Sequence, residues 1–333
     1  MSQATPGNPI RHRWRLLPAG PLWLDGGGMF GLIPRALWTR KVRPDALGRI
    51  PLAHNCLLLD RIDQPRKILI ESGSGNKFNA TARDMYGLAN VSILDALNDA
   101  HCAPEEIDDV ILSHLHFDHA GGLTRALREG ETPDWSSSAF PQGVKLAFPR
   151  ATVHVQRQEW EDALVNRSVM TRTYLPENIF PLRDHVRLLD APAPFPSGYI
   201  PGRDESPASS PAEREREILP GIFGIRVPGH TWGQQAIRFT DDRDRNIVFT
   251  PDVLPTVNHV GSAYNLAYDV EPFISTVTRK WFLRAALNQD WLLLLNHEPG
   301  NPCCCVRENE SGWFSLMPIS PTSHDSAQAL VAD

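Results

Sequence analysis

Four side chains of metal-binding type lie close together in the segment His114-Leu-His116-Phe-Asp118-His119. Imidazole and carboxylate groups are the ligands of zinc and of similar divalent metals. An apolar run precedes the segment, and in an extended chain residues two apart point to the same face, so His114 and His116 can converge on one point. The residues that follow are typical of a turn entering a helix at 120–127, which would aim Asp118 and His119 at a neighbouring point. The spacing therefore predicts a metal site.

Three more residues of ligand type stand in the same local setting, just beyond the end of a predicted apolar strand. Loops on one edge of a rigid sheet are where binding and catalytic sites are normally built. Because the setting recurs, we expect these residues to complete the site. They and the strands they follow are His230 after 223–227, Asp252 after 246–250, and His297 after 291–295.

In this order, the His-x-His-x-Asp-His segment, Gly-His-Thr at 229–231, Asp252 and His297 resemble the metallo-β-lactamase superfamily. The resemblance spans about residues 50–300. It implies an α/β (α+β) protein built as a four-layer αβ/βα sandwich. Two packed mixed β-sheets would be flanked by helices, with two metal ions at one edge of the sheets.

The resemblance also implies ligand roles for two divalent ions, with zinc as the expected metal. The first ion would be held by His114, His116 and His230, the second by Asp118, His119 and His297, and Asp252 would bridge them. Where many relatives carry an Asp after the second strand, this chain has Glu71. Its carboxylate would orient a ligand histidine from outside the coordination sphere.

Within the superfamily, the chain looks most like the N-acyl-homoserine lactonases that quench quorum sensing. The residues that carry this likeness are 24–31 with Pro34 and Trp38, Phe148-Pro149, Glu159-Trp160, 254–256 and 267–269. The likeness implies that a metal-bridging hydroxide opens a lactone ring, with Asp118 and Asp252 as catalytic residues.

Other functions stay open at this point. The same site could serve an organophosphate, aryl-ester or thioester hydrolase, because fold resemblance alone does not fix a substrate. A more remote alternative is a non-catalytic, metal-stabilised ligand-binding protein. Lost ligands would be its signature, and all seven ligand residues are present.

The residue that contacts the substrate is less well marked. Some lactonases place a Tyr soon after the bridging Asp, but residues 253–256 contain none, so His259, Tyr264 and Tyr268 are the substitutes we consider. The aromatic segment 23–38, with Met29 and Phe30, could line an acyl pocket. It could equally pack in the core or at a dimer contact.

The composition of the chain limits the kinds of partner that it is expected to bind. The chain has 333 residues, 41% of them hydrophobic and 22% charged, with a net charge of −6. Nucleic acid and anionic membranes are disfavoured, because phosphate binding needs concentrated Lys and Arg. No stretch reaches the roughly 20 apolar residues that span a bilayer. We expect a small-molecule lactone or ester as partner, and a homodimer is one expected assembly because relatives are often dimers.

Five cysteines, three of them consecutive at 303–305, are a poor disulfide framework. A reduced, cytoplasmic compartment fits better, particularly since residues 1–9 lack the apolar stretch of a secretory signal. A separate cysteine metal site at 303–305 is a minor alternative, because structural zinc sites usually space their first two cysteines apart.

We predict a single metallo-β-lactamase domain at 16–317, with a Pro-, Ser- and charge-rich insertion at 191–217. A flexible segment is predicted at 1–15 and a disordered tail at 318–333. Unevenly alternating helices and strands favour a layered α/β or α+β protein. Besides the strands named above, we predict strands at 55–59, 67–70, 109–112, 151–155 and 236–239 and helices at 93–100, 158–164 and 271–288.

Overall fold

The structure, a computed structural model, describes residues 10–320 except 171, 193, 196–198 and 201–209. Within this part of the chain one sheet has six strands in the order β1-β2-β3-β4-β8-β9. Its last four strands run parallel. The bounds are β1 (His12–Asp25), β2 (Arg49–Arg61), β3 (Lys67–Ile70), β4 (Ile107–Ile111), β8 (Thr152–Gln156) and β9 (Val186–Leu189).

A second sheet follows the order of the sequence from β10 to β16, and only its β13–β14 pair is parallel. Its strands are β10 (Glu215–Leu219), β11 (Ile222–Arg226), β12 (Gln235–Thr240), β13 (Asn246–Thr250), β14 (Leu292–Leu295), β15 (Cys303–Glu308) and β16 (Phe314–Pro318). A small third sheet consists of β5 (Thr124–Arg125), β6 (Trp135–Ser137) and β7 (Phe140–Leu146).

The two large sheets pack face to face because alternate side chains of each strand point to opposite faces. In β2, Leu57 and Leu59 lie in the core between the sheets, whereas Leu58 lies in the core behind the first sheet. In β13, Phe249 lies between the sheets and Val248 behind the second sheet. Each such side chain, once buried, contributes about 1.5–3 kcal/mol of transfer free energy.

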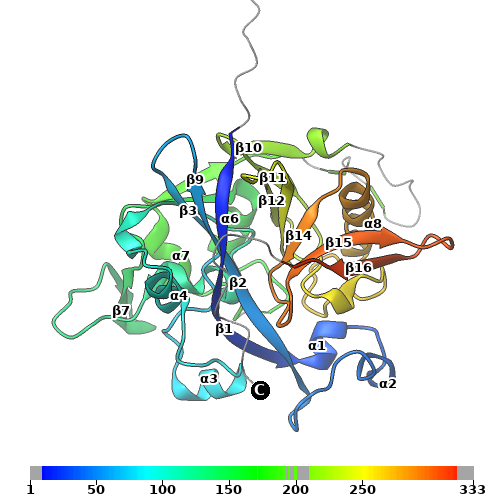
Figure 1. The fold of residues 1–333 in the computed structure, drawn as a ribbon. Coiled ribbons are helices and arrows are strands. Elements are labelled where there is room, and N and C mark those ends of the chain that lie inside the picture. Colours follow the sequence, from blue (N-terminus) through cyan, green and yellow to red (C-terminus); the bar gives the residue numbers. More distant parts are fainter. Residues whose placement is uncertain (1–9, 171, 193, 196–198, 201–209, 321–333) are drawn as a thin grey trace, which may run out of the picture.

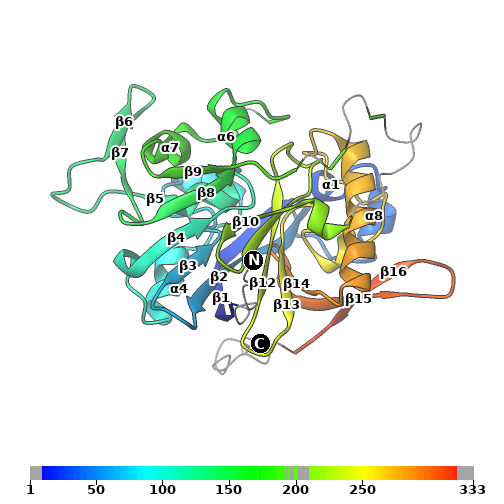
Figure 2. The ribbon, with the colours of Figure 1, turned by 90° about the horizontal axis from the view of Figure 1, so that it is seen from above.

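Helices cover the two outer faces and complete four layers (Figure 2). On the first sheet lie α4 (Ile93–Asp99), α6 (Arg157–Leu164) and α7 (Pro176–Ile179), and on the second lies α8 (Pro272–Asn288). This arrangement confirms the predicted αβ/βα sandwich. The remaining helices are short: α1 (Gly26–Phe30), α2 (Arg35–Trp38), α3 (Ala80–Met85) and α5 (Phe117–Ala120).

The long strands β1 and β2 pair along most of their length and extend beyond the sheet toward α1 and α2 (Figure 1). At that end Leu22, Met29, Phe30 and Trp38 form a separate apolar cluster. The aromatic N-terminal segment therefore packs as a small satellite core beside the two sheets.

The predicted strands and helices are found with shifted ends, except for the helix expected at 120–127. Predicted boundaries of the flexible regions are partly wrong. Strand β1 begins at His12, inside the segment predicted as flexible, because its pairing with β2 starts there. Strand β10 occupies the end of the predicted 191–217 insertion, and β16 reaches Pro318 at the start of the predicted tail.

Residues 1–9, 321–333 and much of the insertion lie outside the described residues, so the predictions for them stay predictions, as does the single domain at 16–317. Among the helices that are described, none combines the length and the apolar character that a membrane crossing requires.

Candidate metal centre

All seven predicted ligand residues meet at one edge of the two sheets. Strand β4 leads into the loop of His114, His116, Asp118 and His119, while β11, β13 and β14 lead into the other three. Each of the seven residues is at most 8% exposed. The sheets are joined directly behind this loop, since the side-chain amide of Gln235 donates to Leu112 O and its backbone N–H donates to Ser113 O.

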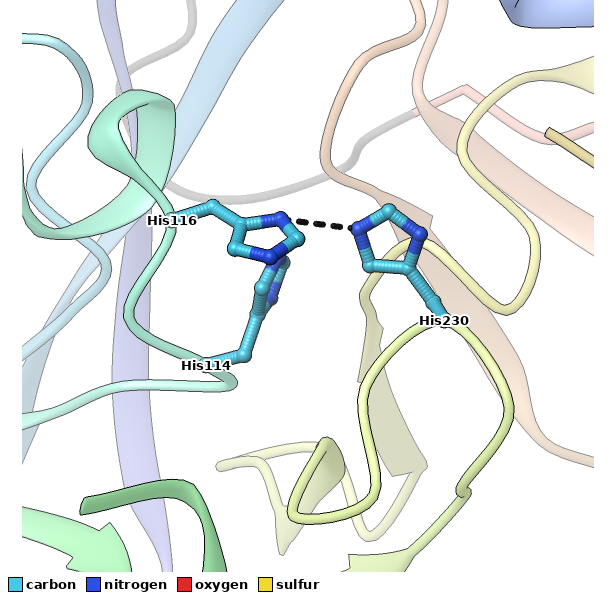
Figure 3. Close-up of side chains that lie close together, drawn as sticks. All are labelled: His114, His116 and His230. Carbon is cyan, nitrogen blue, oxygen red and sulfur yellow. Dashed lines mark hydrogen bonds between the residues drawn. The ribbon is translucent and has the colours of Figure 1, made fainter. Parts of the chain in front are cut away.

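His114, His116 and His230 form what we call the triple-histidine group. Their ligand nitrogens all lie within 4.8 Å of one another. The rings converge from two loops, and His116 Nδ1 lies 3.0 Å from His230 Nε2 (Figure 3). Two imidazole nitrogens held this close suit a shared cation.

Asp118, His119 and His297 form what we call the aspartate group, whose ligand atoms also lie within 4.8 Å of one another. His297 Nε2 is 3.5 Å from Asp118 Oδ2, and His119 Nε2 is 3.9 Å from Asp118 Oδ1. This group mixes carboxylate and imidazole, in contrast to the three imidazoles of the other group.

Asp252 lies between the two groups and presents one carboxylate oxygen to each. Its Oδ2 is 3.2 Å from His230 Nε2, and its Oδ1 is 3.3 Å from His297 Nε2. The side-chain amide of Asn296 donates to Oδ1 at 2.8 Å and fixes the carboxylate. Asp252 therefore faces both groups, each with a different carboxylate oxygen.

The residues fit divalent cations. The Nε2 atoms of His114, His119 and His297 are buried and have no hydrogen-bond partner. Buried polar atoms without a partner are costly, and a cation at the centre of these nitrogens would satisfy them. The minor alternative of a cysteine site gains no support, because within the described part of the chain no cysteine joins a metal-ligand group.

Buried acceptors hold the backs of the ligand rings. Glu71 Oε2 accepts from His119 Nδ1 at 2.8 Å, and its Oε1 accepts from Ser113 N–H at 2.6 Å. Asp269 Oδ1 lies 2.9 Å from His230 Nδ1. Such contacts orient a ligand ring. The sequence pointed to the position of Glu71 but not to the contact of Asp269, although Asp269 belongs to the 267–269 segment noted above.

The ligand residues differ in the direction in which the site shifts their pKa values. Burial and neighbouring imidazoles keep the pKa of His114 and of His116 well below the usual value. In His119 burial acts the same way, but neighbouring carboxylates, led by that of Glu71, outweigh it and raise the pKa. Despite its burial, surrounding histidines hold the pKa of Asp252 well below the usual value. These directions favour an anionic Asp252 and neutral His114 and His116, the states in which these groups bind a metal, whereas the raised pKa of His119 favours its protonated form.

One local prediction is wrong. The helix expected after the motif is instead the single turn α5 inside it, followed by a 3-10 turn at Gly121–Leu123 and then β5. Gly121 and Gly122 pack against the backbone of Ser74 and Ser72, where a side chain would collide. This close packing of backbone on backbone takes the place of the helix that we expected there.

A cavity of about 410 Å³ opens onto the metal-ligand groups. His116, Asp118, His230, Asp252 and His297 form its polar end. Most of the remaining wall is apolar and includes Trp23, Met29, Met85, Tyr86, Met170 and Tyr268.

The predicted substrate-contact residues divide into two sets. Met29 and Tyr268 line the cavity, whereas Phe30, His259 and Tyr264 do not. His259 is fully buried, with one ring nitrogen 2.8 Å from Thr256 Oγ1 and the other 2.8 Å from Met29 O. Its ring stacks on Phe30. Since both nitrogens are engaged, His259 supports the cavity wall from behind.

Comparison with known proteins agrees with this geometry. Residues 49–140 match the family model of the metallo-beta-lactamase superfamily. An N-acyl homoserine lactonase from Bacillus thuringiensis is 22% identical over 275 residues, covering 79% of this chain and 84% of that protein. A Bacillus sp. N-acyl homoserine lactonase is 24% identical over 236 residues, covering 67% of this chain and 73% of that protein.

Among solved structures, a probable metal-dependent hydrolase from Staphylococcus aureus has a TM-score of 0.70 at 22% identity, covering 93% of this chain and 98% of that chain. Fold, matched segment and metal-ligand groups point to one class: residues 49–140 match the metallo-beta-lactamase superfamily, and the chain shares its fold with a probable metal-dependent hydrolase. Within that class it is similar to the N-acyl homoserine lactonases.

Proposed function

We propose that this protein is a dinuclear metal-dependent hydrolase that opens lactone rings, with N-acyl-homoserine lactones as its substrate class. The observation that carries the proposal is the 410 Å³ cavity, whose polar end is the metal-ligand edge and whose wall is mainly apolar. Such a cavity suits a substrate with one polar reacting ring and an apolar tail. The likeness to N-acyl homoserine lactonases supports the same choice.

The seven ligand residues are proposed to hold two zinc ions, one in each group, with Asp252 between them. Nitrogen and oxygen ligands suit zinc. Bound there, such ions would supply Lewis acidity toward a carbonyl oxygen and lower the pKa of water to about 7.

The protein's own residues would orient the reaction around these groups. Asp252, held by Asn296, fixes the spacing between them and carries the proton of the attacking water, at a carboxylate oxygen, to the ring oxygen that leaves. Asp118 lies at the cavity wall, where its carboxylate would act beside Asp252. One water is consumed, and the lactone becomes a hydroxy acid.

Tyr268 is the proposed donor to the substrate carbonyl. Burial, together with the carboxylates of Asp25 and Asp118, raises the pKa of its phenol, so the hydroxyl keeps its proton. The hydroxyl oxygen lies only 1.9 Å from where a Cβ at Gly28 would stand. Gly28 thus leaves the space that Tyr268 occupies.

The test is a substrate panel on purified, zinc-loaded protein: N-acyl-homoserine lactones of increasing chain length, paraoxon, an aryl ester and a thioester, with metal content measured on the same sample. Lactone kcat/KM far above the others, with about two metals per chain, is the expected result. Two metals with faster turnover of another substrate would reject the lactonase proposal and retain the hydrolase. Two metals without any turnover would favour a ligand-binding protein.

We also propose that the protein forms a homodimer and is located in the cytoplasm. Both come from the sequence: the first from the likeness to the superfamily, the second from the five unpaired cysteines, all of them free and buried. Light scattering of the purified chain tests the dimer directly.

A further inference from the structure

Glu159 on α6 is a buried carboxylate outside the seven ligand residues. It is 0% exposed, and among the described residues no Lys, Arg or His forms an ion pair with it. Burial raises the pKa of its carboxyl group, although three hydrogen bonds act against burial. Arg226 interacts with it electrostatically but makes no ion pair, and burying a carboxylate without an ion-pair partner is costly, so a carboxylate at this place needs a reason.

Each of its three donors belongs to the surroundings of the triple-histidine group. Leu115 N–H, between His114 and His116, donates to Oε1 at 2.9 Å. Thr231 Oγ1, next to His230, donates to Oε2 at 2.5 Å.

The third donor is Tyr174, whose hydroxyl donates to Oε1 at 2.8 Å. The Tyr174 ring packs against the His116 ring with centroids 5.0 Å apart. One carboxylate thereby ties together the backs of two ligand loops that come from different sheets.

The His230 loop also rests directly on the backbone of α6. A Cβ at Gly233 would lie 2.3 Å from Glu159 N. Because no side chain fits there, this loop approaches α6 closely enough for Thr231 to reach the carboxylate.

We propose that Glu159 is a positioning residue for the triple-histidine group, setting the metal affinity of that group and leaving the aspartate group largely unaffected. It acts through Leu115, Thr231 and Tyr174 and touches no ligand ring. The inference rests on the proposed binding of two metal ions, but it concerns metal affinity and holds for any substrate.

The test is a zinc titration in competition with a chromophoric chelator, on the full chain. Glu159→Ala should lower the affinity for one of the two zinc ions about 10- to 100-fold, the range found for residues behind metal ligands. Glu159→Gln should fall between Glu159→Ala and the wild type, because its amide can still accept from Leu115 and donate to a rotated Thr231 hydroxyl. Asp162→Asn is the matched control, as Asp162 is a buried carboxylate of the same helix that binds Gln158 and Arg167 instead.

Histidine ¹⁵N spectra at limiting zinc identify the affected group. The zinc-dependent shifts of His114, His116 and His230 should weaken in Glu159→Ala, while those of His119 and His297 persist. If Glu159→Ala does not fold, Thr231→Val removes one donor with little change of shape. It should lower the affinity for the same zinc ion, as seen in the same spectra. Equal weakening of both ions, or wild-type titrations for the variant that folds, would overturn the proposal.

Discussion

The triple-histidine group and the aspartate group are supported in different ways. Behind the aspartate group, Glu71 contacts a ligand ring directly, that of His119, at 2.8 Å. Behind the triple-histidine group, Asp269 likewise contacts the His230 ring at 2.9 Å, whereas Glu159 contacts only a backbone N–H and two hydroxyls. Glu71 and Glu159 are both buried, but Glu71 reaches a ligand ring, whereas Glu159 reaches only the loops that carry the ligands. The difference teaches that a ligand can be positioned through its ring or through the chain that carries it.

The largest effect is expected where the two groups meet. Asp252→Ala removes the carboxylate that faces both groups, so both metals should be lost and kcat/KM should fall by more than about 100-fold, exceeding changes behind the ligands. Metal analysis and lactone kinetics on one sample measure this, with exposed Asp99→Ala as control. Full activity with two bound metals would reject the bridging role.

Direct contact should make Glu71 more sensitive than Glu159. Glu71→Gln is expected to lower the affinity for zinc about 10- to 100-fold. Its effect should exceed that of Glu159→Gln, because an amide leaves His119 Nδ1 without a charged acceptor. The two variants are compared in the same chelator titration. A smaller loss for Glu71→Gln than for Glu159→Gln would reverse the comparison.

Tyr268 allows the substrate side to be separated from both metal groups. Tyr268→Phe should lower lactone kcat/KM about 10-fold, the cost of one hydrogen bond, while zinc content stays at the wild-type value. Gly28→Ala should have a similar effect, because its Cβ displaces the Tyr268 hydroxyl. Unchanged kinetics in Tyr268→Phe would remove this residue from the site.

The last prediction concerns the stability of the protein and the side chain of Lys77, which lies behind the aspartate group. Its amine donates to Gly121 O and, at 2.7 Å, to Thr124 O, and burial lowers its pKa to about 7. The unfolded chain therefore binds this proton up to a higher pH than the folded chain, so stability rises with pH above 7. The gain is about 2 kcal/mol between about pH 8 and pH 9.5.

Lys77→Met should flatten that rise in urea denaturation measured across the same pH range. Lys145→Met is a control, since Lys145 forms an ion pair with Asp134 nearer the surface. An unchanged slope for Lys77→Met would show that Lys77 is not the group responsible.

The sequence predicted most of the metal-ligand edge, because residues 114–119 are local and the other ligands each follow an apolar strand. It singled out Glu159 with Trp160 but could not predict the contacts of Glu159, because its partners Leu115 and Thr231 lie 44 and 72 positions away along the chain. The sequence also offered His259 as a possible substrate contact. Only the fold shows that both of its ring nitrogens are already engaged. Contacts of this kind depend on how the sheets pack.

The most direct measurement is anomalous X-ray diffraction at the zinc edge from crystals of the zinc-loaded chain. The account predicts two peaks, one inside the triple-histidine group and one inside the aspartate group, with Asp252 contacting both. A single peak, or zinc bound outside these seven residues, would contradict it.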